Sequence, residues 1–195
     1  MHPDDKPIFA EYPKHTFNLK FPPPAFVGDV DAAPIVILMS NGGYKPGITE
    51  REFPDEASIS EYRRYIRGEV HALPPRLSPY YATGRVGEWI HAGQAVVVNA
   101  VPYRSPGLSQ EADNRKAAEH LRSLAAHRRW VMQEVLPEAT RCRRFLLVHR
   151  NGWWKVPERL AGDCVLFSDA ERAEPNRQWP DQEKLDRAED WLRGR

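Results

Sequence analysis

Two short apolar runs constrain the fold of this chain more than any other feature. Residues 35–39 and 95–101 are rich in β-branched side chains, and the first run is apolar at every position. Runs without polar alternation are typical of strands covered on both faces, as in a parallel sheet. Residues 145–148 and 164–167 repeat the pattern later in the chain. The sequence therefore predicts a central parallel sheet of four strands.

Helical patterns separate these runs. A capping box at residues 58–61 opens a helix, a second short helix is expected near 85–92, and residues 108–136 carry the longest helical pattern. The tail, residues 180–195, predicts a C-terminal helix. Strands that alternate with helices imply an α/β fold with three layers, α/β/α, and helices on both faces of the sheet.

Length and composition place the chain among single globular domains. A length of 195 residues fits one domain over residues 1–195, in which we interpret the proline-rich segment 1–25 as an arm laid over the domain. The formal net charge is +1, so a general electrostatic attraction to nucleic acid or to an anionic membrane is not expected.

The cysteine count and the hydropathy pattern bear on location. Only two cysteines occur, Cys142 and Cys164, too few for a four-cysteine zinc or iron–sulfur site. We see no secretory signal and no apolar run near the ~20 residues of a membrane helix. We therefore expect a cytoplasmic protein with both thiols reduced and no membrane association. We also expect a monomer.

Ligands of parallel sheets bind outside the carboxyl ends of the strands, which directs attention to four loops. Residues 40–46, 99–106, 149–154 and 168–179 occupy these places. The first loop reads Asn41-Gly42-Gly43-Tyr44, and its glycines let the backbone approach a ligand. It lacks the spacing of a P-loop, and a tight strand-to-helix turn is an equally good interpretation.

The second loop starts from Asn99, an amide that follows three valines. A buried amide needs partners, which are either nearby backbone groups or a planar ligand with adjacent C=O and N–H groups. Arg104 and Ser105 follow and offer a phosphate fork and a hydroxyl.

The third and fourth loops carry most of the remaining charge. His149, Arg150 and Lys155 flank a Trp pair that either closes a core or lid or stacks on a base. The fourth loop contains Arg172 between carboxylates and is most simply a solvated charged turn.

Taken together, these strands and loops resemble the uracil-DNA glycosylase superfamily over residues 33–170. The first family motif has the form Gly-Gln-Asp-Pro-Tyr or Gly-Ile-Asn-Pro-Gly after the first core strand, where this chain reads Ser40-Asn41-Gly42-Gly43-Tyr44. A later family strand ends Leu-Leu-Leu-Asn, and here it reads Val96-Val97-Val98-Asn99. Phe53 lies where the family places the aromatic residue that stacks on the base.

The resemblance implies a uracil-DNA glycosylase-like fold and an enzyme of DNA base-excision repair. It implies that Asn41 orients the attacking water, that Asn99 contacts the uracil edge, and that Phe53 stacks on the flipped base. It also implies that base contacts come from Gly42, Gly43 and Tyr44, and that no metal or organic cofactor is needed. DNA is the expected partner, bound by Arg104, Ser105, Arg150, Lys155 and Arg172, of which Arg104, Arg150 and Lys155 are candidates for phosphate contacts.

One departure from the family pattern matters for catalysis. The last family motif, His-Pro-Ser-Pro, is replaced here by residues 167–171, which contain neither His nor Pro. Either the electrophile shifts to His149 or Arg172, or catalysis is lost. Two alternatives therefore stand beside the glycosylase: a non-catalytic uracil- or DNA-binding member of the superfamily, and a small hydrolase of free nucleosides.

Overall fold

The computed structural model describes residues 2–108, 111–168 and 180–195. Within them, a five-stranded sheet with the order β1-β3-β2-β4-β5 forms the centre of the molecule. Neighbouring strands run parallel except for β1, which pairs antiparallel with β3. The strands are β1 (Phe26–Val27), β2 (Ile35–Gly43), β3 (Ala95–Ser105), β4 (Phe145–His149) and β5 (Val165–Ser168). The α/β class is confirmed, but the sheet has five strands and not the predicted four.

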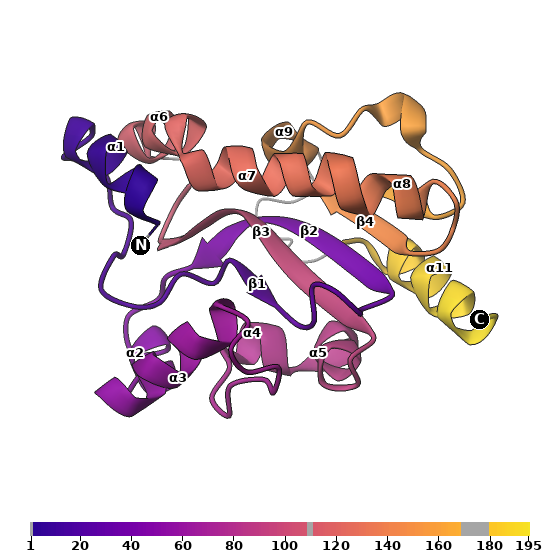
Figure 1. Cartoon of the computed structure of the whole chain (residues 1–195), viewed down its shortest axis with the longest axis horizontal. Helices are drawn as coiled ribbons and strands as arrows, with labels where there is room; N and C mark the ends of the chain where they lie inside the picture. Colours follow the sequence, from indigo (N-terminus) through magenta and orange to yellow (C-terminus); the bar gives the residue numbers. More distant parts are fainter. Residues whose placement is uncertain (1, 109–110, 169–179) are drawn as a thin grey trace.

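Helices flank the sheet on both faces, with α6, α7 and α8 on one side and α3, α4 and α5 on the other (Figure 1). The α-helices are α1 (Lys6–Glu11), α2 (Thr49–Glu52), α3 (Glu56–Ile66), α4 (Pro79–Ala82), α5 (Gly84–His91), α6 (Ala112–His120), α7 (Arg122–Trp130), α8 (Leu136–Ala139), α9 (Asn151–Trp154) and α11 (Gln182–Arg193). Two short 3-10 helices, η1 (Pro3–Asp5) and η3 (Glu158–Leu160), and the π-helical turn η2 (Val131–Val135) complete the described elements.

The apolar strands divide their side chains between two cores, because successive residues of a strand point to opposite faces. In β2, Val36 and Leu38 join the core beneath α7 and α8. Ile35 and Ile37 join the core beneath α4, α5 and α11. All four side chains are fully buried, which explains why the sequence shows no polar alternation here.

Two predicted boundaries are wrong for local reasons. The cap of α3 is Asp55 and not Ser58: the Asp55 carboxylate accepts from the Ser58 N–H at 2.8 Å, and Ser58 Oγ bonds back to Asp55. The turn expected from residue 40 is also wrong, because β2 continues to Gly43 and β3 continues beyond Asn99 to Ser105.

The long helical pattern predicted over residues 108–136 is interrupted at Leu121, whose backbone is extended. The reason is a contact from the N-terminal arm. Asp5, fully buried, accepts from the backbone N–H groups of Arg122 and Ser123 at 2.7 and 3.2 Å and from the Tyr103 hydroxyl at 2.8 Å. A carboxylate at this place satisfies the first free N–H groups of α7 and favours a new helix start.

The N-terminal arm is more structured than predicted. It contains η1 and α1, and it then runs along the edge of the sheet. Asn18 forms a β-bridge with Arg104, and the Asn99 N–H donates to the Ala25 carbonyl at 2.9 Å. The residues before β1 therefore form backbone hydrogen bonds along the outer edge of β3.

The expectation of two reduced thiols is wrong, because Cys142 and Cys164 form a disulfide with a Cα–Cα distance of 5.3 Å. The bond ties the turn before β4 to the start of β5, at the end of the sheet where both strands begin. Cytoplasmic location stays a prediction that no longer has reduced thiols in its favour. Within the described residues, no helix is both long enough and apolar enough to cross a membrane.

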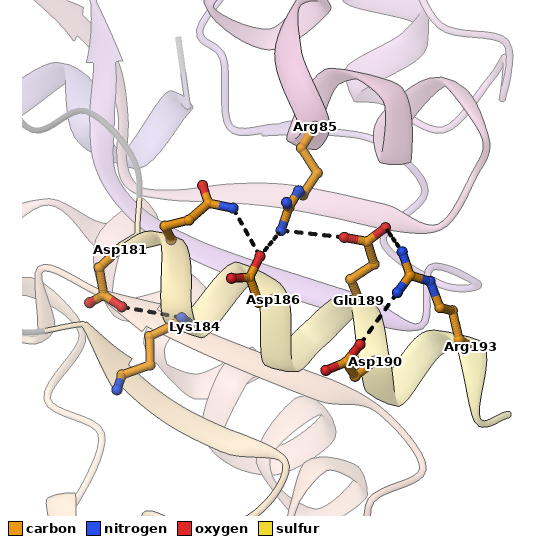
Figure 2. Close-up of polar contacts among 8 residues, drawn as sticks. Arg85, Asp181, Lys184, Asp186, Glu189, Asp190 and Arg193 are labelled. Carbon is orange, nitrogen blue, oxygen red and sulfur yellow. Dashed lines mark hydrogen bonds and ion pairs between the residues drawn. The ribbon is translucent and has the colours of Figure 1, made fainter.

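The predicted C-terminal helix is confirmed as α11, which packs against β4 and is fixed to α5 by charge (Figure 2). Arg85 of α5 contacts Asp186 at 2.5 Å and Glu189 at 3.3 Å. Arg193 contacts Glu189 at 2.6 Å, so that one carboxylate is shared by two guanidinium groups. Asp181 caps the helix by accepting from the Lys184 N–H at 3.2 Å.

Candidate functional site

A cleft of about 890 Å³ lies at the carboxyl ends of β2, β3 and β4, where the sequence predicted a site. Its volume falls within the range of ligand pockets, which is about 300–1,000 Å³. Seven residues predicted for the site line it: Asn41, Gly43, Tyr44, Arg104, Ser105, His149 and Arg150. The lining is completed by residues that include Ser40, Lys45, Glu52, Ser78, Tyr80, Tyr81 and Trp153.

Asn41 is held in one orientation at the end of β2. Its Nδ2 donates to the Ser105 Oγ at 2.9 Å and to the Gly42 carbonyl at 3.0 Å. Among the described residues, Oδ1 accepts only from the Ser40 hydroxyl, at the long distance of 3.5 Å. Since both N–H donors are used, Oδ1 has the remaining capacity and can accept a hydrogen bond from a water or a ligand.

Arg104 and Glu52 form a buried ion pair in the wall of the cleft. Nη2 lies 2.8 Å from Oε2 and Nη1 lies 3.3 Å from Oε1, and the side chains are 3% and 4% exposed. The guanidinium also lies over the Phe53 ring, 5.5 Å from its centroid. Burial raises the pKa of Glu52, and Arg104 opposes that rise. Arg104 thus has a carboxylate partner within the protein, in contrast to its predicted phosphate contact.

The third predicted loop forms the rigid helix α9 beside the cleft. Arg150 and Lys155, at its two ends, adopt left-handed backbone conformations with φ of 63° and 61°. Trp154 is buried and its Nε1 donates to the Met39 carbonyl at 2.9 Å, whereas Trp153 lines the cleft. Trp154 therefore closes the core, as one interpretation predicted, whereas stacking of a base on Trp153 stays a prediction.

Sequence reasoning missed the tyrosines of α4. Tyr80 and Tyr81 line the cleft with Ser78, whose hydroxyl caps α4 by accepting from the Tyr80 N–H. Burial raises the pKa of both phenols, so they stay protonated at neutral pH. Ser78-Pro79 is a helix-start signal, and it could have predicted that Tyr80 and Tyr81 lie on a short helix.

Several predicted base contacts lie outside the cleft lining. Phe53 is buried and stacks on Phe21 with ring centroids 5.3 Å apart. Gly42 packs against Pro24, and Asn99 is 1% exposed behind Tyr81, with its Nδ2 donating to the Tyr81 hydroxyl at 3.1 Å.

Among the predicted cations, Lys155 is exposed beyond the cleft, and Arg172 lies outside the described residues. The described part of the chain contains no cluster of three or more His, Cys, Asp or Glu side chains that is suited to a metal ion.

Comparisons of the chain with family models, with curated proteins and with solved structures found no match.

Proposed function

We propose that this chain is a uracil-DNA glycosylase-like protein that binds a base flipped out of DNA in the cleft and hydrolyses its N-glycosidic bond. The observation that carries the proposal is the Asn41 carboxamide, which Ser105 holds at the carboxyl edge of the sheet with Oδ1 available. This oxygen can accept a hydrogen bond from one water and leave a lone pair of that water free to attack the sugar carbon. As the new C–O bond forms, the C–N bond breaks, the base departs as an anion with the electron pair, and that anion takes up the proton that the attacking water gives up.

The aromatic walls of the cleft suit a planar ligand. Tyr44, Tyr80 and Trp153 line the cleft, and base–aromatic stacking contributes about 1–3 kcal/mol per base. We assign stacking to this group in place of Phe53, because the Phe53 ring lies between Phe21 and the Arg104 guanidinium.

The charges around the cleft suit a nucleic-acid backbone. Lys45 and Arg150 line it, and exposed Lys155 follows at the far end of α9. These side chains come from two loops at the same edge of the sheet, so one DNA strand can contact them together. Phosphate contacts of this kind make affinity fall steeply with salt.

Single-turnover excision from a uracil-containing oligonucleotide tests the proposal, with the abasic product cleaved by alkali and resolved on a gel. We expect Asn41→Ala to lower the rate about 100-fold or more, as the loss of a positioned polar group commonly does. Asn41→Asp keeps the acceptor and adds charge stabilisation, so its rate should persist or rise. Asn18→Asp, which places the same charge outside the cleft lining, is the matched control.

One observation favours a second function, a binding protein that does not catalyse. Glu52 is the single carboxylate among the described residues lining the cleft, and Arg104 already pairs with it. No other acidic side chain of that lining can take a proton from water. Tight binding of uracil-containing DNA without excision by the wild type would establish the binder and refute the enzyme.

A further inference from the structure

The carboxamide of Asn99 is an unusual buried group. It is 1% exposed, and its Oδ1 has no hydrogen-bond partner within the described structure. Its Nδ2 donates to the Pro24 carbonyl at 2.6 Å and to the Tyr81 hydroxyl at 3.1 Å. An acceptor left unpaired in a protein interior is costly, and native structures keep few of them without a reason.

Asn99 lies directly behind the cleft. In the sheet it pairs with Met39, which lines the cleft, and its side chain contacts Tyr81, which forms another part of the same wall. The Tyr81 side chain therefore belongs to the cleft wall and contacts the Asn99 amide directly. Burial raises the pKa of the Tyr81 phenol, so its hydroxyl remains a neutral partner for the amide.

We propose that Tyr81 determines specificity by competing with the ligand for Asn99: it moves aside when a base with adjacent N–H and C=O groups enters. The carbonyl of the base then replaces the Tyr81 hydroxyl as acceptor for Nδ2, and the N–H of the base donates to Oδ1. The exchange conserves the bonds of Nδ2 and supplies Oδ1 with the donor that it lacks. This inference rests on the proposed function, because it concerns the base-binding part of the same site.

The exchange selects one kind of base edge. Uracil presents an imide N–H beside a carbonyl, which matches an acceptor beside a donor in the Asn99 amide. Cytosine presents an acceptor and an amino group at the equivalent positions, so it would place an acceptor against Oδ1 and a donor against Nδ2. Only an edge of the first kind can displace Tyr81 with a net gain of one hydrogen bond.

The test measures binding of two fluorescent single-stranded oligonucleotides by anisotropy. One carries a single deoxyuridine that a 2′-fluorine makes resistant to hydrolysis, and the other carries a tetrahydrofuran abasic analogue at the same position and reports backbone contacts alone. Variants are Tyr81→Phe, Asn99→Ala and the double variant. Tyr62→Phe removes another buried phenol hydroxyl, from outside the cleft lining, and is the control.

We expect Tyr81→Phe to tighten deoxyuridine binding about three- to tenfold, since one competing hydrogen bond is removed. Binding of the abasic oligonucleotide should not change, and the gain should vanish in the Asn99→Ala background. Weaker or unchanged deoxyuridine binding by Tyr81→Phe, in a wild type that prefers deoxyuridine over the abasic analogue, would overturn the Tyr81 inference alone. A wild type without that preference would overturn the proposed function and this inference with it.

Discussion

The buried pair of Glu52 and Arg104 allows a quantitative prediction about stability. Two short contacts join the side chains, and both are almost fully buried. Arg104 Nε has no hydrogen-bond partner in the described structure, so Glu52 supplies the side-chain hydrogen bonds of the guanidinium. Removing either partner therefore leaves a buried charge without compensation.

The single variants Glu52→Leu and Arg104→Met should each lower the free energy of unfolding by about 3–5 kcal/mol. The double variant removes both charges and fills the space with apolar atoms, so it should be close to the wild type or more stable. For a domain of this size, 1 kcal/mol corresponds to about 2–4 °C in Tm, so each single variant should lose roughly 6–20 °C.

Urea denaturation of the four proteins completes a double-mutant cycle. Additive effects of the two single variants would refute the reasoning, because they would show that neither charge depends on the other. Arg104→Met carries a further signature in its pH dependence. Burial already raises the pKa of Glu52, and loss of Arg104 raises it further, so the unfolding free energy of this variant should increase relative to that of the wild type as pH falls from 7 toward 5.

Three further perturbations have clear expected outcomes. The disulfide joins residues 22 apart in sequence, so Cys142→Ser should cost about 3 kcal/mol in urea denaturation, and dithiothreitol should have no further effect on the variant. Asp5→Ala should cost about 1–3 kcal/mol and speed amide exchange at the start of α7, because two backbone N–H groups lose their acceptor. Burial lowers the pKa of His127 in the native protein, whereas the unfolded chain binds a proton at this histidine below about pH 6.5. The unfolding free energy of the wild type should therefore fall as pH drops through that value. His127→Gln should make this fall in unfolding free energy shallower. The control variant His91→Gln, at an exposed position, should leave the fall unchanged.

Sequence alone was sufficient for the parallel strands and the place of the cleft. Residues 35–39 and 95–101 are buried on both faces, and strands of this kind appear in the sequence as nearly continuous apolar runs. The rule that ligands bind at the carboxyl edge of such a sheet then located Asn41 and His149 correctly in the cleft lining.

Contacts between distant segments could not be predicted in this way. Asp5 interrupts a helical pattern more than 100 residues away, and Glu52 pairs with Arg104 across 52 positions. Phe53 was assigned a stacking role from its spacing after the first motif, yet it joins an aromatic cluster with Phe21 of the arm. Each outcome depends on which side chain of a distant element packs at the position, and the hydropathy period of the local sequence contains no such information.

The N-terminal arm also explains why glycine is required at one position of the first motif. A Cβ at Gly42 would overlap the ring of Pro24 in this structure. The carbonyl of the same Pro24 accepts from Asn99, and the next residue, Ala25, accepts from the Asn99 backbone. The close approach of β2 to the arm at Gly42 therefore places Pro24 against Asn99. In this chain, Gly42 serves the packing of the arm that positions the Asn99 amide, and the site depends on a segment that the motifs alone would leave out.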